Sequence, residues 1–283
     1  MKIAIYGTGA IGSTFALHLA RVGHDVTCVA RGERLAQLRA SGLIVTDDGR
    51  RAAVSARERL DPAIPFDLVI VTVLAHKVDA VLPALRASAA RTVLFMFNQF
   101  EPLARLRDAL GAERVAFAFP AVIASIDDGV LTARVVTLGQ RTLASAPQWA
   151  DLFTQAGIPT DVEPEMQSWL RTHAVIIATL AALGVTARRR GAGLRFDEAR
   201  AYARALREGL DLVEALGERI LPPGMVLLRV LPLDAVATAL FLLSRSGLVR
   251  ALGVVGADEP RALVDAMLAA APGALPALSA IRP

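Results

Sequence analysis

The chain has 283 residues, of which 54% are hydrophobic and 20% charged, and its formal net charge at pH 7 is +4. This composition excludes an intrinsically disordered protein, and so small an excess of positive charge does not indicate a nucleic-acid partner. The single cysteine, Cys28, cannot form a disulfide within the chain, and no group of His and Cys residues has the spacing of metal ligands. We therefore expect no disulfide scaffold, no metal site and no nucleic-acid partner.

Neither the start of the chain nor its most apolar stretches have the features of a targeting or membrane segment. The apolar run at residues 1–7 is short, ends in glycine and has no small-residue cleavage site. Residues 174–187 are fewer than the roughly 20 that a spanning helix needs. Residues 226–243 are interrupted by two charged residues and a proline. We expect a cytoplasmic protein with no membrane partner.

The first half of the chain alternates short β-type runs with helix-like segments, a pattern typical of a parallel sheet wrapped by helices. Strands are predicted at residues 2–6, 25–30, 66–73, 92–97 and 115–119. Apolar residues at helical spacing predict helices at residues 11–21, 34–40, 78–87 and 103–110. Further along, the pattern predicts a hairpin added to the sheet at residues 129–138, a helix at 149–155 and an edge strand at 159–162.

From Glu163 onward, β-type runs nearly vanish and long helical patterns replace them. These patterns predict helices at residues 166–183, 196–216, 233–252 and 260–271. The fold class predicted is α/β, with an N-terminal Rossmann dinucleotide-binding domain followed by an all-helical C-terminal domain. We place the NADP-binding domain at residues 1–162, and a helical domain for substrate and dimer contacts at residues 163–283.

A glycine motif lies between the first strand and the first helix. Gly7, Gly9 and Gly12 form G-x-G-x-x-G. In a Rossmann unit the first glycine permits the tight turn, the second lets the backbone approach a pyrophosphate, and the third permits close packing of the helix. The alternative is a glycine-rich turn without a ligand. The motif predicts that the cofactor contacts Gly7, Thr8, Gly9, Ala10, Ile11 and Gly12.

The end of the second strand indicates which nicotinamide cofactor binds. An NAD site usually has an acidic residue there, which takes the ribose hydroxyls. This chain has Arg31 instead, and a guanidinium pairs bidentately with a 2′-phosphate. NADP is therefore the predicted cofactor. In the alternative interpretation, Arg31 is a solvated charge and Glu33 serves the ribose.

Five groups of residues together point to one family: residues 2–12, 30–35 with 40–43 behind them, 71–78, 97–101 and 169–171. They resemble, in the same order, the phosphate loop, the NADP-selecting loop, the next two cofactor-contacting turns and the first helix of the second domain in the ketopantoate reductase family. The resemblance implies a Rossmann domain and a helical domain with the active site in the cleft between them. It also implies that Val73, Leu74 and Asn98 contact the cofactor.

Both lysines that this family carries near the reaction are replaced in this chain. Leu74 stands where the family has a lysine near the nicotinamide, and Arg171 stands where it has its catalytic lysine. A lysine gives up a proton, whereas an arginine is always charged and is a poor general acid. His76 and His173 are the histidines nearest in sequence, and we expect both to be structural.

Other family positions are kept only in part. The family asparagine is present as Asn98, but the glycine after it is Gln99. Two asparagines further along the family's opening helix of the second domain correspond to Val175 and Thr179. The family's late serine and acid motif is not identifiable in residues 236–247, which are largely apolar.

These residues lead to two catalytic predictions. Arg171 engages a substrate carboxylate or oxyanion, and Asn98 positions the nicotinamide or the substrate. In the alternative for Arg171, its guanidinium pairs with Glu163, Glu165 or another surface acid.

The resemblance implies an NADP(H)-dependent oxidoreductase that reduces a small carbonyl compound other than ketopantoate, with a carboxylate as the favoured substrate type. Two alternatives stay open: an NADP-binding sensor or partner-binding module without hydride transfer, and a non-reducing enzyme that uses the same cleft. The apolar residues around most of the helix at 174–187 would also suit a homodimer contact.

Overall fold

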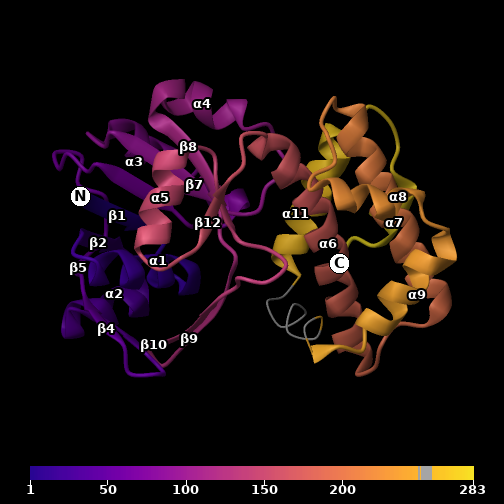
Figure 1. Ribbon diagram of the computed structural model, residues 1–283, viewed down its shortest axis with the longest axis horizontal. Helices are drawn as coiled ribbons and strands as arrows, with labels where there is room; N and C mark the ends of the chain where they lie inside the picture. Colours follow the sequence, from indigo (N-terminus) through magenta and orange to yellow (C-terminus); the bar gives the residue numbers. More distant parts are fainter. Residues whose placement is uncertain (248, 250–256) are drawn as a thin grey trace. The chain divides into compact units, whose positions relative to one another are not determined.

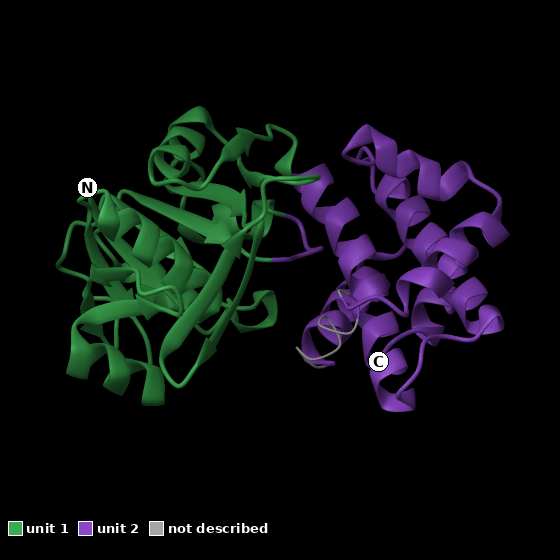
Figure 2. Ribbon diagram, turned by 60° about the horizontal axis from the view of Figure 1, so that its bottom comes forward, with its two compact units in different colours: residues 1–97, 103–166 green, residues 98–102, 167–283 purple. Residues whose placement is uncertain are grey.

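The computed structural model describes residues 1–247, 249 and 257–283 (Figure 1). Contacts divide the chain into two units (Figure 2). The sheet unit comprises Met1–Phe97 and Leu103–Met166, and the helical unit comprises Asn98–Pro102 and Gln167–Pro283. The sequence predicted one boundary, between residues 162 and 163. The observed division lies four residues later, and it assigns the short segment 98–102 to the helical unit.

The sheet unit is built on an eight-stranded sheet in the order β12-β11-β8-β7-β6-β1-β2-β5. All neighbouring strands pair in parallel except β11 and β8. The central strands are almost continuously apolar because helices and loops cover both faces of a parallel sheet. Their bounds are β1 (Lys2–Tyr6), β2 (Asp25–Val29), β5 (Ser55–Arg57), β6 (Leu68–Val71), β7 (Thr92–Met96), β8 (Val115–Phe119), β11 (Thr142–Ala144) and β12 (Thr160–Val162).

Helices connect these strands. They are α1 (Ala10–Arg21), α2 (Gly32–Ser41), α3 (Leu82–Ala87), α4 (Ala104–Leu110) and α5 (Pro147–Gln155), with short 3-10 turns η1 (Ala75–Lys77) and η2 (Ala112–Arg114). Helices α1 and α5 share one face of the sheet, where the rings of Phe15 and Phe153 meet edge to face at 5.0 Å. The alternation of parallel strands and helices confirms the predicted Rossmann-like fold.

A second, four-stranded sheet of the same unit has the order β4-β3-β10-β9. Its strands are β3 (Leu43–Thr46), β4 (Arg51–Ala53), β9 (Val122–Asp127) and β10 (Val130–Val135). The hairpin predicted at residues 129–138 thus starts earlier, at Val122, and β10 pairs with β3 instead of extending the main sheet. The prediction missed this sheet because β3 and β4 are short and the pairing of β3 with β10 is remote in sequence.

The helical unit consists of α6 (Met166–Arg190), α7 (Phe196–Ala215), η3 (Pro223–Val226), α8 (Leu227–Val230), α9 (Leu233–Leu243), α11 (Asp258–Ala270) and α12 (Pro276–Ala280). Helices α6 and α7 approach closely at Gly209, where an added Cβ would lie 2.6 Å from Cγ1 of Val175. Val175 and Thr179 are fully buried in this unit. Helix α9 ends at Leu243, and residues 244–246 form a turn, so the continuous helix predicted at 233–252 is wrong at these positions. Residues 248 and 250–252 of that prediction lie outside the described residues.

Helix α6 is long and apolar enough, by length and composition alone, to cross a membrane. The bent pair formed by Pro223–Val230 and Leu233–Leu243 passes the same test. However, 67% of the apolar window of α6 is buried inside the protein. This burial is the pattern of a core helix in a globular unit.

Candidate cofactor site

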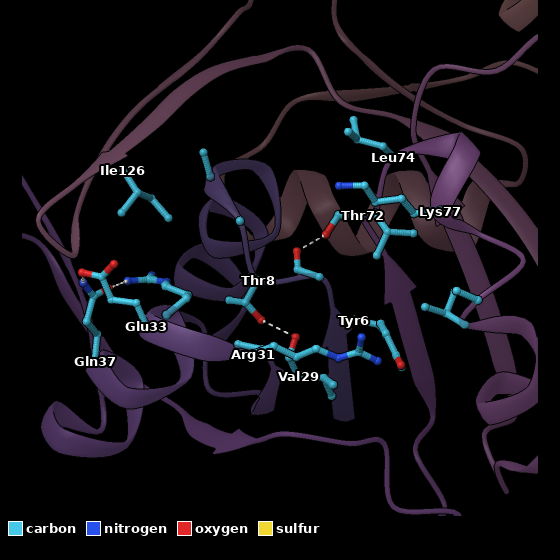
Figure 3. A pocket seen from close by; sticks show the side chains of 18 of the residues that line it. Tyr6, Thr8, Val29, Arg31, Glu33, Gln37, Thr72, Leu74, Lys77 and Ile126 are labelled. Atoms are coloured by element: carbon cyan, nitrogen blue, oxygen red, sulfur yellow. Dashed lines mark hydrogen bonds between the residues drawn. The ribbon is translucent and has the colours of Figure 1, made fainter. Parts of the chain in front are cut away.

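The glycine loop after β1 is held against the loop after β6. Gly7 has φ +100°, and an added Cβ would lie 2.9 Å from Cγ1 and 3.1 Å from the backbone nitrogen of Val73. Thr72 Oγ1 donates to the Gly7 carbonyl at 2.6 Å, and Thr8 Oγ1 donates to the Val29 carbonyl at 3.1 Å (Figure 3). Only glycine fits at position 7, because both the backbone conformation and the close approach exclude a side chain.

The other two glycines of the motif differ in their surroundings. An added Cβ at Gly12 would lie 2.4 Å from the Gly7 carbonyl oxygen, so this glycine permits close packing of α1. At Gly9 an added Cβ would meet no atom within 4 Å. Gly9 is the N-cap of α1, which has no side-chain cap and no acidic residue in its first turn. This open helix start fits the pyrophosphate of a dinucleotide, because its amides and dipole favour an anion.

A cavity of about 860 Å³ opens over this loop, within the size range of small-molecule sites. Seven of the predicted cofactor residues line it: Gly7, Thr8, Gly9, Ala10, Arg31, Val73 and Leu74. Ile11, Gly12 and Asn98 are not among the lining residues. The cavity also receives Asp128 and Gly129 from the β9–β10 turn. The sequence did not predict this contribution, since the turn is about 100 residues from the glycine motif and no local pattern links the two.

The end of the cavity at β2 and α2 carries two arginines. Arg34 Nη2 donates to Ser13 Oγ at 2.9 Å, and its Nη1 donates to the Gly129 carbonyl at 3.2 Å. Burial lowers the pKa of Arg34. Arg34 was not predicted, although its position three residues after Arg31, in the first turn of α2, was a usable signal. Glu33 also lines the cavity and accepts a bond from Gln37 Nε2 at 3.2 Å.

The turn η1 brings two further titratable side chains to the cavity, His76 and Lys77. Figure 3 shows Lys77 among the side chains that line the cavity, with Thr72 and Leu74. Leu74, which replaces the family lysine, is 36% exposed. The site therefore retains an amine close to the position where the lysine is missing. Lys77 was not predicted as a site residue, because it lies three residues after the position of the family lysine.

Asn98 belongs to the helical unit in this structure. Its Nδ2 donates to Oε1 of Glu259, at the start of α11, at 2.8 Å. Its Oδ1 is buried and has no hydrogen-bond partner among the residues that the structure describes. The bond to Glu259 fixes the orientation of the Asn98 amide, and its Oδ1 can still accept a hydrogen bond. Glu259 was not predicted, because it lies beyond residues 236–247, where the family's late serine and acid motif would lie.

Arg171 is buried, with 6% of its surface exposed. Its Nη1 donates to Glu218 Oε1 at 3.1 Å, and its Nε donates to the Phe100 carbonyl at 3.1 Å. Ser168 Oγ donates to the other oxygen of Glu218 at 2.6 Å. Arg171 thus pairs with an acid, as in the alternative, but the acid is the partly buried Glu218 and not Glu163, Glu165 or another surface acid. Engagement of a ligand by Arg171 stays a prediction.

The two histidines near these positions differ. His173 stacks on Trp169 with ring centroids 4.7 Å apart, and burial lowers its pKa to about 4. The lowered pKa favours the neutral imidazole at pH 7, which is a poor general acid. His76 is exposed in the wall of the cavity. Within residues 1–247, 249 and 257–283, no three His, Cys, Asp or Glu side chains gather as ligands for a metal ion.

Comparison with known proteins gives one family. The model of the family described as ketopantoate reductase PanE/ApbA matches residues 3–147. A 2-dehydropantoate 2-reductase from Vibrio cholerae is 30% identical over 185 residues, which are 60% of this chain and 58% of that protein. One from Mesorhizobium japonicum is 38% identical over 85 residues, 29% of this chain and 26% of that protein. The matches thus span less than two thirds of these curated relatives.

Solved structures extend the likeness in fold to the whole chain. A PanE/ApbA family ketopantoate reductase from Ralstonia eutropha JMP134 has a TM-score of 0.77 at 23% identity, covering 100% of this chain and 96% of that one. A D-mandelate dehydrogenase in complex with NADH and anilino(oxo)acetate has a TM-score of 0.75 at 15% identity, with the same coverage. These similarities include the helical unit, beyond the region that the family model matches.

Proposed function

Because the chain belongs to the ketopantoate reductase PanE/ApbA family, we propose that it is an NADP(H)-dependent oxidoreductase acting on a small carbonyl compound. The observation that carries the proposal is the cavity over the glycine loop. It combines an uncapped helix start and open space at Gly9 with Arg31 and Arg34 at one end. The nicotinamide supplies the hydride when it is bound. The chain's own residues bind the pyrophosphate and ribose, and they stabilise the negative charge that develops on the substrate oxygen.

The cofactor preference follows from the arginines. A 2′-phosphate accepts bidentate bonds from Arg31, whereas a 2′-hydroxyl does not. NADPH should bind at least about tenfold more tightly than NADH, which is about 1.4 kcal/mol. Arg31→Ala should abolish the preference for NADPH over NADH, which titration calorimetry measures. The control is Arg39→Ala, since Arg39 is an exposed residue of the same helix that does not line the cavity. Equal affinities in the unaltered protein would contradict the NADP assignment.

For the substrate, we propose a small carboxylate-bearing carbonyl compound other than ketopantoate. The support is the replacement of both family lysines, by Leu74 and Arg171. A structural neighbour with D-mandelate dehydrogenase activity holds anilino(oxo)acetate, a small carboxylate. The test is NADPH oxidation with ketopantoate and phenylglyoxylate in parallel. We expect ketopantoate to react very slowly or not at all, and rapid reduction of ketopantoate would contradict the proposal.

One observation favours a second candidate function, NADP binding without hydride transfer. Arg171 is already paired with Glu218, and Leu74 offers no polar group. A protein that binds NADP without hydride transfer, acting as a sensor, is therefore the second candidate. It predicts tight NADPH binding with no oxidation by any carbonyl or imine in a panel.

The proposal includes a cytoplasmic location and a homodimer. A solved ketopantoate reductase from Staphylococcus aureus is described as dimeric. Light scattering after gel filtration tests the oligomeric state, and a monomer at micromolar concentration would contradict this part.

A further inference from the structure

Lysine is rare in this chain. Only Lys2 and Lys77 are present among 31 lysine and arginine residues. One of these two amines lines the cofactor cavity. Since arginine carries the positive charge almost everywhere else, charge alone does not account for a lysine at this position. Lysine differs from arginine in its ability to release a proton.

Lys77 is placed by the turn that follows β6. This turn, η1, begins after the segment Thr72–Leu74, whose Thr72 hydroxyl is bonded to Gly7. Lys77 lines the cavity together with Thr72 and Leu74 (Figure 3). Lys77 is exposed, and no ion pair joins it to an acid in the described parts of the chain. Its ammonium is therefore available to a ligand in the cavity.

The proposed reaction needs a proton donor at the substrate oxygen. Hydride addition to a carbonyl carbon generates an alkoxide, which must be stabilised and protonated. Leu74 has no proton to give, Arg171 is a poor acid and is paired with Glu218, and His173 is neutral. None of these three residues can donate a proton as the missing family lysine would. Lys77 has the required chemistry and lines the cavity.

We propose that Lys77 is the proton donor of the reduction, an inference that rests on the proposed function. A bound reduced nicotinamide would supply the hydride, with its electron pair, to the carbonyl carbon while the C=O π pair moves to oxygen, a two-electron reduction of the carbonyl to the alcohol. The Lys77 ammonium gives its proton to that oxygen, and the neutral amine then recovers a proton from water.

A first experiment tests the position of Lys77 without any turnover. Trace acetylation with acetic anhydride is followed by mass spectrometry, and Lys2, which is also exposed, serves as the internal control. Saturating NADP⁺ should slow acetylation of Lys77 at least about fivefold and leave Lys2 unchanged. Adenosine 2′,5′-bisphosphate, which lacks the pyrophosphate and nicotinamide, should protect neither lysine. Unchanged labelling of Lys77 with NADP⁺, or equal protection by the bisphosphate, would overturn the proposal.

A second experiment separates proton donation from simple charge. With NADPH and phenylglyoxylate as the probe, Lys77→Arg and Lys77→Met should both lower kcat at least about 100-fold, the usual contribution of a general acid. Lys77→Arg keeps the positive charge but cannot readily give up the proton, so a loss of kcat in both variants separates the two roles. Lys2→Met is the matched control and should keep full activity. Full activity in Lys77→Arg would show that Lys77 serves only as a counter-ion and would overturn the proposal.

A rescue variant completes the test. Leu74→Lys combined with Lys77→Met returns a lysine to the family position three residues earlier. The kcat of this double variant should be at least about tenfold higher than that of Lys77→Met. Failure of the double variant to exceed Lys77→Met, when circular dichroism shows it folded, would count against the proposal. If the unaltered enzyme reduces no probe carbonyl, the proposed function fails. The labelling pattern decides separately whether Lys77 meets the cofactor.

Discussion

At the scale of single residues, the partners of Arg171 determine what it can do. Two of its donors are bonded to Glu218 and to the Phe100 carbonyl, and its guanidinium lies 5.4 Å from the centre of the Phe100 ring. A substrate carboxylate would have to compete with these charge-assisted bonds. Within its own unit, Arg171 holds the segment Asn98–Pro102 against α6 and stabilises it.

This arrangement predicts a loss of stability on substitution. Arg171→Met leaves Glu218 without its charged partner in a largely buried position, and it should lower the free energy of unfolding by about 2 kcal/mol. Glu218→Gln should have a similar effect, and the double variant should cost less than the sum of the two. Urea denaturation measures all three. Arg188→Met, an exposed position near the end of the same helix, is the control. Unchanged stability together with lost ligand binding would instead favour a substrate role for Arg171.

At the scale of elements, the loop from β1 to α1 assigns different roles to two glycines. Gly9 has an extended backbone, with φ −75° and ψ −162°, and empty space where a Cβ would be. Gly12 has no such space, because the Gly7 carbonyl and the Thr72 hydroxyl lie against it. The structure therefore leaves open space at Gly9, whereas Gly12 is needed for packing.

Alanine substitutions should separate these two roles. Gly9→Ala should change the free energy of unfolding by less than about 0.5 kcal/mol, because any residue tolerates this backbone, but should weaken NADPH binding at least about tenfold. Gly12→Ala should destabilise the protein by about 2 kcal/mol through overpacking. Thermal unfolding and calorimetric titration measure the two effects. Equal losses of stability in both variants would argue against an open pyrophosphate site at Gly9.

Helix α6 should give the protein a pH-dependent stability. Burial lowers the pKa of His173 to about 4 in the folded state, whereas in the unfolded chain it is near 6.5. The unfolded chain therefore takes up the proton first, and the stability that is fully present above pH 6.5 is lost as the pH falls toward 4. Between pH 7 and pH 5 this loss should be about 2 kcal/mol. In urea unfolding, His173→Phe should retain stacking on Trp169 and lose about 2 kcal/mol less than the unaltered protein over this range.

At the scale of the whole molecule, the chain passes from one unit to the other more than once. The segment Asn98–Pro102 follows β7 of the sheet unit, yet it belongs to the helical unit. Phe100 in this segment is 1% exposed and packs in the apolar core of the helical unit. The core of that unit therefore depends on a side chain supplied from the N-terminal half of the sequence.

Two phenylalanines five residues apart should consequently stabilise different units. Phe100→Ala should lower hydrogen-exchange protection in α6, and Phe95→Ala should lower it in β7 and β8, where Phe95 stacks on Phe117. Each substitution of a buried phenylalanine should cost about 3 kcal/mol or more. Exchange measured by mass spectrometry resolves the two units. Loss of protection in the same elements for both variants would contradict the division at residues 98–102.

Local patterns determined much of the fold. Apolar runs flanked by turn residues predicted β1, β2, β6, β7 and β8, and helical spacing predicted α1, α6 and α7. These elements were predictable because a strand or helix with a buried face carries its periodicity in its own residues. The glycine motif was readable for the same reason, since the turn, the close approach and the packing are all local demands.

Only the tertiary structure decided which remote residues meet. The β9–β10 turn beside Arg34, the pairing of Asn98 with Glu259 and the ion pair of Arg171 with Glu218 join positions that are 47 to 161 residues apart in sequence. No periodicity specifies such pairs, because each depends on where complete elements pack. The sequence by itself therefore determined a Rossmann-like unit followed by helices. The surroundings of its catalytic candidates were fixed only when the chain folded, because a side chain's hydrogen bonds and burial depend on neighbours brought in from other elements.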